Sequence, residues 1–125
     1  MSSLQTERRL FAFLKTWADE AGVALYTHDL KDANLPYGVL ELQSCDTLCA
    51  QSAYVANVTV TLVTQSEGSL ARTRLLEGLK RFLELERRPH ICVRIEGHTQ
   101  EMAKDNFTHT STLTCQVLLQ THLEE

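Results

Sequence analysis

Apolar residues recur along this chain with two different periods, and the order of these periods predicts its elements. Residues 4–21 and 70–86 repeat apolar side chains every three or four positions, which is typical of amphipathic helices. Five other segments alternate apolar and polar residues or form short apolar runs, as half-buried strands do. These strand segments are residues 23–27, 37–42, 54–64, 91–95 and 107–120.

Each predicted helix has one apolar stripe and recognisable ends. Ser2 or Ser3 can cap the first helix and Ser69 the second, whereas Gly22 stands where a left-handed residue would stop the first. The first stripe consists of Leu10, Phe11, Leu14, Trp17, Ala18 and Ala21, and the second of Leu75, Leu76, Leu79, Phe82 and Leu83.

Residues 54–64 form the clearest predicted strand. Tyr54, Ala56, Val58, Val60 and Leu62 point one way, and polar residues such as Thr59 point the other. This strand is either an exposed edge that accepts a neighbour's strand or a central strand paired on both sides. The last strand alternates in the same way, with Leu113, Cys115, Val117 and Leu119 on one face and threonines on the other.

These elements predict one α+β domain over residues 1–125. Two amphipathic helices need one sheet to cover, so we expect two layers, with both helices on one face of a mixed or antiparallel sheet. The expected order is α-β-β-β-α-β-β. Periodicity stops at residues 43–53 and again at 97–106, and both stretches are predicted to be loops.

Composition and charge indicate a globular protein and argue against nucleic-acid binding, membrane insertion and secretion. An apolar fraction of 43% and a charged fraction of 22% are those of a globular protein, and the 125 residues suffice for one core. A net charge of −4 disfavours nucleic-acid binding as the main task. The longest apolar run, residues 10–14, is too short to cross a membrane, and the N-terminus lacks the layout of a signal peptide. We therefore expect a protein made in the cytosol, without a membrane partner.

Candidate chemistry is sparse. Cys45 and Cys49 have a spacing that zinc ligands use, but no second close pair of Cys or His completes a site. A thiol nucleophile would need a positioned histidine, and no paired carboxylates, phosphate-binding loop or His-Glu-x-x-His motif is present. Cys92 and Cys115 lie within apolar alternations and are predicted to be buried free thiols. We expect no enzyme, cofactor or metal; a zinc site and a thiol-dependent enzyme are the alternatives.

The whole layout resembles a family of virus-assembly proteins. The initial helix and short strand, then Leu35-Pro36-Tyr37 before the second strand, are similar to the tail completion and tail terminator (minor tail protein U-like) proteins of long-tailed bacteriophages. The resemblance continues through the alternating run 56–62, Ser69-Leu-Ala-Arg with the second helix, and the last strand at 112–118. It spans nearly the whole chain as a match of pattern and length.

This resemblance implies a structural role without catalysis or cofactor. Similar proteins form a ring, typically of six copies, that caps the tail tube, stops its growth and meets the head connector or stopper, while DNA passes through the lumen. It implies a location in the tail or neck of a virion assembled in the host cytoplasm. Another neck or head-tail connector protein, or a non-viral α+β adaptor, is the alternative. We expect interface residues in and beside the two predicted loops, at Cys45, Asp46, Leu48, Tyr54, Glu101, Met102 and Asp105.

Overall fold

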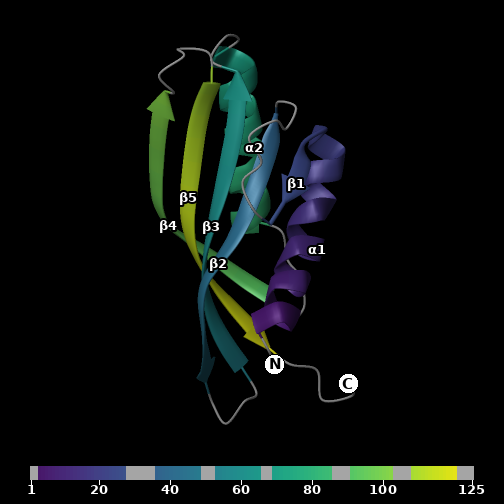
Figure 1. Ribbon diagram of the computed structural model, residues 1–125, viewed down its shortest axis with the longest axis vertical. Coiled ribbons are helices and arrows are strands. Elements are labelled where there is room, and N and C mark those ends of the chain that lie inside the picture. The colour runs from purple at the N-terminus through teal and green to yellow at the C-terminus, as the bar shows by residue number, and fades with distance from the viewer. Residues whose placement is uncertain are drawn as a thin grey trace.

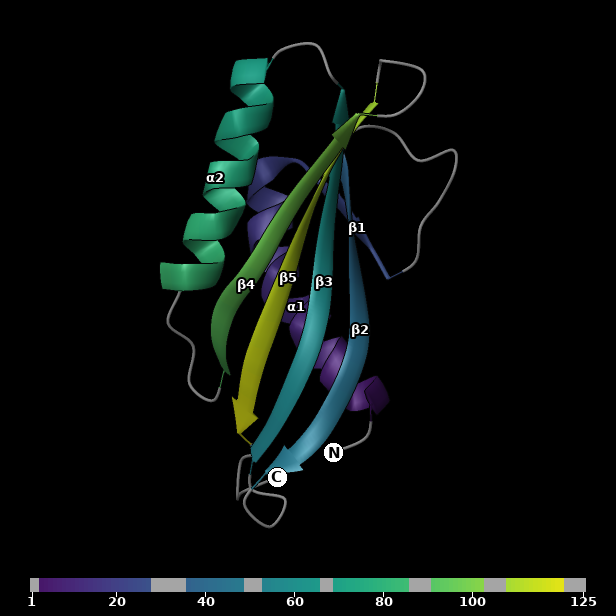
Figure 2. The ribbon, with the colours of Figure 1, turned by 90° about the vertical axis from the view of Figure 1, so that its left-hand side faces the viewer.

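The computed structural model of this chain describes residues 3–27, 36–48, 53–65, 69–85, 91–102 and 108–120. Within these residues, two helices lie against one face of a five-stranded sheet, so the molecule has two layers (Figures 1 and 2). The predicted α+β class and element order are confirmed. The elements are α1 (Ser3–Ala21), β1 (Ala24–Tyr26), β2 (Tyr37–Leu48), β3 (Ala53–Gln65), α2 (Ser69–Leu85), β4 (Ile91–Met102) and β5 (Thr108–Gln120).

The end of α1 is set by Gly22, as the sequence predicts. Gly22 has a φ of 75°, a left-handed conformation that residues with a Cβ rarely adopt. The backbone N–H of Val23 donates a hydrogen bond to the carbonyl oxygen of Ala18 at 2.9 Å, which satisfies an acceptor that the helix end leaves open. Val23 is buried, so the chain turns back onto the core. Neither of the described helices is long and apolar enough to span a membrane.

The strands lie in the order β1-β2-β3-β5-β4, and the sheet is mixed. The short β1 is parallel to β2, whereas β2–β3, β3–β5 and β5–β4 are antiparallel pairs. β3 pairs along its length with β5 on one side and with β2 on the other. Of the two alternatives for residues 54–64, the central strand is therefore correct and the exposed edge is wrong.

Both stretches predicted to be loops are partly strand, and a β-bulge explains each error. β2 continues to Leu48, and its register with β3 shifts between Leu42 and Ser44, which leaves Gln43 as an extra residue. β4 continues to Met102, with the corresponding shift leaving Glu96 extra. An extra residue reverses the alternation of faces, so the apolar pattern loses its phase although the strand goes on.

The core lies between the helices and the inner face of the sheet, which we define as the face toward the helices. The predicted stripes point into it, with Leu14, Ala18, Leu79 and others buried, together with Phe13, which the predicted stripe omits. The side chains of the two central strands complete the core: Tyr54, Ala56, Val58, Val60, Leu62, Leu113, Cys115, Val117 and Leu119. Each predicted inward-facing residue of these strands is thereby confirmed.

A smaller apolar cluster lies on the outer face, which is the face away from the helices. Tyr37, Val39 and Val63 are buried there, and the rings of Tyr26 and Tyr37 meet edge to face with centroids 6.1 Å apart. This cluster joins β1 to the start of β2 and to the end of β3. It therefore fixes the three-residue β1 at one end of the sheet.

Candidate functional site

The predicted interface residues occupy different places from those expected. Cys45, Asp46 and Leu48 belong to β2 rather than to a loop, and Glu101 and Met102 end β4. Asp46 and Glu101 are exposed, whereas Cys45 is half-buried. Tyr54 is buried in the core, so its side chain is not available to a partner. Asp105, like Cys49 of the possible zinc pair, lies outside the described residues.

Five of the predicted interface residues lie in β2 and β4, the strands that form the two margins of the sheet. Among the described residues, β4 pairs with β5 alone, and its other edge pairs with no strand. All of Ile91–Met102 therefore forms one margin, here called the β4 margin. β1 pairs with β2 only from Tyr37 to Val39. In the described chain, residues 40–48 of β2 therefore form a second free margin, here called the β2 margin. Figures 1 and 2 show the two margins on opposite sides of the sheet.

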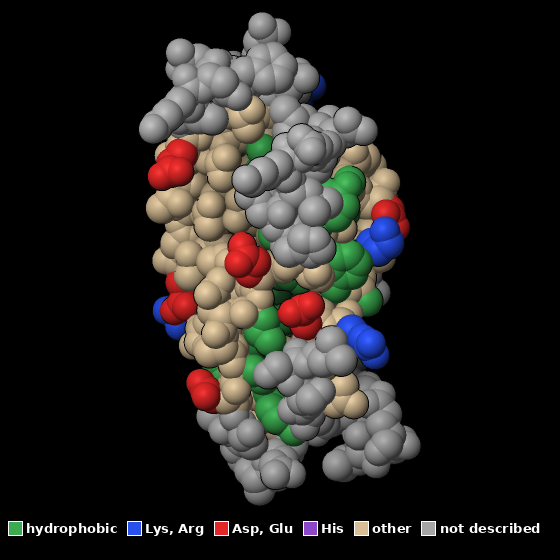
Figure 3. Space-filling view, in the orientation of Figure 1, with side chains coloured by type: hydrophobic (Ala, Val, Ile, Leu, Met, Phe, Trp, Pro, Cys, Tyr) green, Lys and Arg blue, Asp and Glu red, His purple; other side chains and the backbone are tan. Residues whose placement is uncertain are grey.

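The outer face between these margins is polar and rich in threonine. Gln43 donates a hydrogen bond to Thr59 at 3.0 Å and Asn57 to Ser44 at 2.8 Å, and both bonds tie β2 to β3. Cross-strand pairing places further polar residues on the same face, namely Thr61, Thr99, Thr110, Thr112, Thr114 and Gln116. Near one end of this face, Val55, Leu118 and Cys92 form an apolar row across three strands. In Figure 3, much of the view is taken up by uncharged polar side chains and backbone, with scattered acidic side chains.

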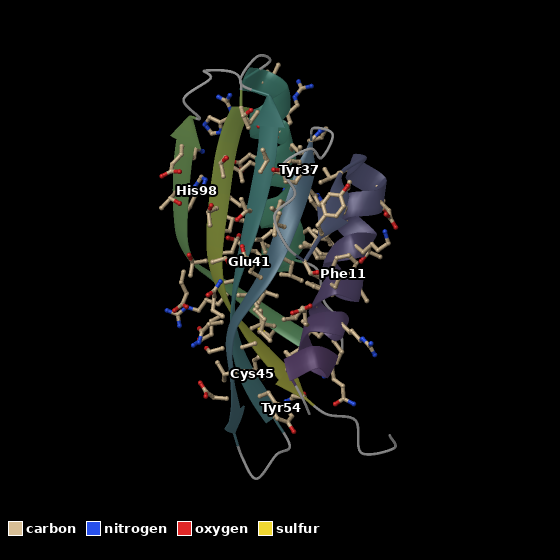
Figure 4. The ribbon with its side chains drawn as sticks, viewed as in Figure 1. Phe11, Tyr37, Glu41, Cys45, Tyr54 and His98 are labelled. Carbon is tan, nitrogen blue, oxygen red and sulfur yellow. The ribbon has the colours of Figure 1, made fainter. Side chains whose placement is uncertain are left out.

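Charge is unevenly distributed between the margins on this outer face. The β2 margin carries Glu41 and Asp46, which are both exposed. The β4 margin carries Arg94 near its start and Glu101 near its end, and Glu96 is exposed at the bulge. The β2 margin is thus purely acidic, whereas the first half of β4 presents a cation. Glu41 is labelled on β2 in Figure 4.

On the inner face, both margins carry apolar side chains that the core covers only in part. Leu42 and Cys45 of β2 and Phe11 of α1 are half-buried beside the β2 margin, and Phe11 and Cys45 are labelled in Figure 4. The thiol of Cys45 lies 3.5 Å from the hydroxyl of Thr6 on α1. The β4 margin has three such residues, Ile91, Val93 and Ile95. At each margin, the outer face therefore carries polar side chains and the inner face carries apolar side chains that are only partly buried.

The cysteines differ strongly in environment. Cys115 is buried, and burial, helped by the charge of Glu96, raises the pKa of its thiol to about 11. This thiol stays protonated at neutral pH and is a weak nucleophile. Cys92 is exposed on the outer side of β4, so the prediction that it is buried is wrong. Ile91 and Val93 point inward, and strand alternation turns the residue between them outward.

Two histidines, His98 of β4 and His109 of β5, lie on the inner face of the sheet and interact electrostatically with charged residues of α2. His109 is only 7% exposed, and its Nδ1 has no hydrogen-bond partner in the described structure. Burial is the main cause that lowers the pKa of His109, with smaller contributions from Arg72 and His98. Burial likewise lowers the pKa of His98, as does Lys80, against an opposing effect of Glu77. In both residues the lowered pKa favours the neutral imidazole. His98 is labelled on β4 in Figure 4.

Sequence reasoning missed the margin residues Leu42, Cys92, Arg94 and Ile95. Their strands are visible in the sequence, but their position at a margin depends on strand order, which local patterns do not encode. The break in alternation at Gln43 and Glu96 was a usable signal. A bulge next to a strand end is a common feature of sheet edges.

The comparisons with known proteins support the fold. No protein-family model matches the sequence, and no curated protein matches it. Among solved structures, a chain described as "Virion of native gene transfer agent (GTA) particle" has a TM-score of 0.55 and 13% sequence identity, with 84% of each chain covered. At this identity, the likeness shows a shared fold.

Proposed function

We propose that this protein is a structural component of a phage-like virion, and that it acts as a tail terminator or tail completion protein. In this proposal, copies of the chain form a ring of six on the finished end of the tail tube. The ring stops addition of tube protein and offers its other side to the head connector. The protein binds and assembles, and it catalyses no reaction.

The observation that carries this proposal is the pair of free margins on a sheet whose fold is shared with a virion chain. Sheet margins are usually blunted or covered in soluble monomers, because their free N–H and C=O groups recruit other strands. Two unlike margins on opposite sides of one sheet suit a chain that contacts two copies of itself. A head-to-tail contact of this kind closes into a ring when its rotation allows.

The charge of the outer face fits a lumen that DNA passes through. Glu41, Asp46 and Glu101 lie on this face, and the formal net charge of the chain is −4. On this hydroxyl-rich wall the acidic side chains outnumber the cation Arg94, so the wall repels phosphates and disfavours retention of the duplex. We therefore propose that the outer face lines the lumen and that the helices face outward.

The test is whether the purified protein controls tube length. Growing tail tubes of the same virion should become shorter as the protein is added, and electron microscopy should show a ring at one tube end with sixfold averages. Tubes that grow unchanged, together with antibody labelling at the head side of the neck, would assign the chain to another neck protein instead. Absence of the protein from purified particles would refute a virion role.

A further inference from the structure

If this chain forms a ring, as the proposed function requires, each copy must contact the next through two different surfaces, and the two margins of the sheet are suited to this contact. The two margins are comparable in length, since the β4 margin spans Ile91–Met102 and the β2 margin residues 40–48. Neither strand contains proline or lysine, two common devices against edge pairing. Exposed charges are present on both strands, but cross-strand register places Glu41, Asp46, Arg94 and Glu101 on the outer side.

Strand direction permits a continuous sheet across copies. The pairs β2–β3, β3–β5 and β5–β4 are all antiparallel, so these strands alternate in direction across the sheet. A rotation about an axis along the strands preserves every strand direction. The four strands β2, β3, β5 and β4 alternate in direction, so β2 and β4 of one copy run in opposite directions. In a rotated copy β2 keeps its direction, and it therefore lies antiparallel to β4 of the neighbouring copy. This is the favoured pairing geometry.

The side chains at the margins are complementary on the inner face and, at Arg94, on the outer face. On the inner face, Leu42 and Cys45 on one margin and the residues Ile91, Val93 and Ile95 on the other are half-buried, so pairing would complete the burial of both sets. On the outer face, Arg94 of one copy would meet the acidic side chains of the next, Glu41 and Asp46. Pairing two β2 margins would instead set acid against acid.

We infer that copies of this chain join head to tail by strand addition, with residues 40–48 of β2 in one copy paired antiparallel with β4 of the next. The partner is a second copy of the same chain, and the contact uses backbone hydrogen bonds for strength and the acid–Arg94 contacts for orientation. Repeated around a ring, this contact makes one closed sheet with the threonine-rich face on one side and all helices on the other.

Cysteine cross-linking tests the contact, because Cys92 already stands exposed on the outer side of the β4 margin. Three variants, Glu41→Cys, Ser44→Cys and Asp46→Cys, place a second thiol on the outer side of the β2 margin. Each is combined with Cys49→Ser and oxidised. In at least one variant, we expect a ladder of covalent products beyond the dimer, since each copy then has one exposed thiol on the outer face at each margin. The ladder should disappear on reduction and in Cys92→Ser.

Charge reversal gives an independent readout. Arg94→Glu should weaken self-association by about tenfold, the scale on which a cross-strand attraction becomes a repulsion. Combining it with Asp46→Arg or Glu41→Arg should restore association, because the charges are exchanged. The matched control is Arg81→Glu, the same change at an exposed position of α2, which should leave association unchanged. Sedimentation velocity over a concentration series measures all of these proteins.

Several outcomes would overturn the inference, and they differ from a failure of the proposed function. Oligomers without a ladder in any variant would show that another surface makes the ring. A Cys92–Cys92 dimer as the sole product would show a two-fold β4–β4 contact. A monomer at every soluble concentration, without cross-linking, would also refute strand addition. A full ladder from a protein that leaves tube growth unchanged would instead refute the terminator role alone.

Discussion

The rings of Phe13 and Phe82 lie with centroids 4.9 Å apart and planes tilted by 39°, and they join α1 to α2 above the sheet. α1 packs mainly against β2 and β1, whereas α2 packs mainly against β4 and β3. The aromatic pair therefore connects two helices that otherwise cover different parts of the sheet. Its loss should affect the whole helical layer.

Replacing Phe82 with alanine should lower the free energy of unfolding by about 2–3 kcal/mol, because the half-buried ring loses its apolar contacts and its aromatic partner. Leu85→Ala, on the same helix, is the control. Leu85 is 63% exposed and should change stability by less than about 0.5 kcal/mol. Urea unfolding followed by circular dichroism measures both, and equal effects would show that the ring pair does not hold the helices together.

Two glycines should respond in opposite directions to substitution by alanine. Gly22→Ala should destabilise the protein by about 1 kcal/mol, since its φ of 75° is strained for any residue with a Cβ. Gly78→Ala should stabilise it by roughly 0.5–1 kcal/mol, because alanine is the better helix former. The added methyl group would meet Trp17 Nε1 at 3.6 Å, an ordinary contact. Thermal unfolding of the two variants beside the natural protein shows whether the signs differ.

The amino-acid pattern predicts most of the fold because local periods and burial agree in this chain. Leu14 and Leu79, from the stripes of the two helices, are buried as expected, and so are Val58 and Val117, from the alternations of the two central strands. What the pattern does not encode is where one strand lies relative to another. The assignment of residues 54–64 to a central strand depends on pairing with residues that are distant in the sequence.

The candidate site is less predictable for the same reason. The sequence predicts Asp46 and Glu101 to be loop residues, but they stand on strand margins, and Tyr54, predicted at an interface, is buried. The bulges at Gln43 and Glu96 change the phase of the alternation, so strands that continue look like loops. Arg94 is not predictable from its neighbours in the sequence, because its place at a margin depends on β4 being the last strand of the sheet.

Stability should fall as the pH drops below neutrality, owing to His109. Burial lowers the pKa of His109 below its ordinary value of 6.5, so the unfolded chain binds a proton more readily than the folded one. The contribution of the neutral imidazole to the free energy of unfolding is therefore fully present above about pH 6.5. It is lost as the pH falls from there through the lowered pKa of the folded state. His98, whose pKa is also lowered, adds to the same trend.

The variant His109→Phe should reduce this pH dependence, because it removes the group that must be protonated and the unpartnered Nδ1. When the pH is lowered from about 7.5 to about 5, the unfolding free energy should decrease less steeply for the variant than for the natural protein. His98→Gln is the comparison, since His98 is exposed and should account for a smaller part. Parallel curves for the natural protein and His109→Phe would contradict this account.

The proposed lumen predicts that the outer face repels DNA through its own charges. Glu101→Lys with Thr112→Lys and Thr114→Lys changes the charge by +4 and brings the formal net charge from −4 to zero, with all three lysines on the outer face. Glu20→Lys with Glu84→Lys makes the same change at exposed positions of α1 and α2. If the outer face lines the lumen, rings of the first variant should retain duplex DNA, with an affinity that falls steeply as salt rises, whereas the helix variant should behave like the natural protein. Electrophoretic mobility shifts over a salt series measure both.

If the two variants retain DNA equally, the net charge of the chain determines DNA binding, whichever face carries the lysines. The assignment of the outer face to the lumen would then be wrong.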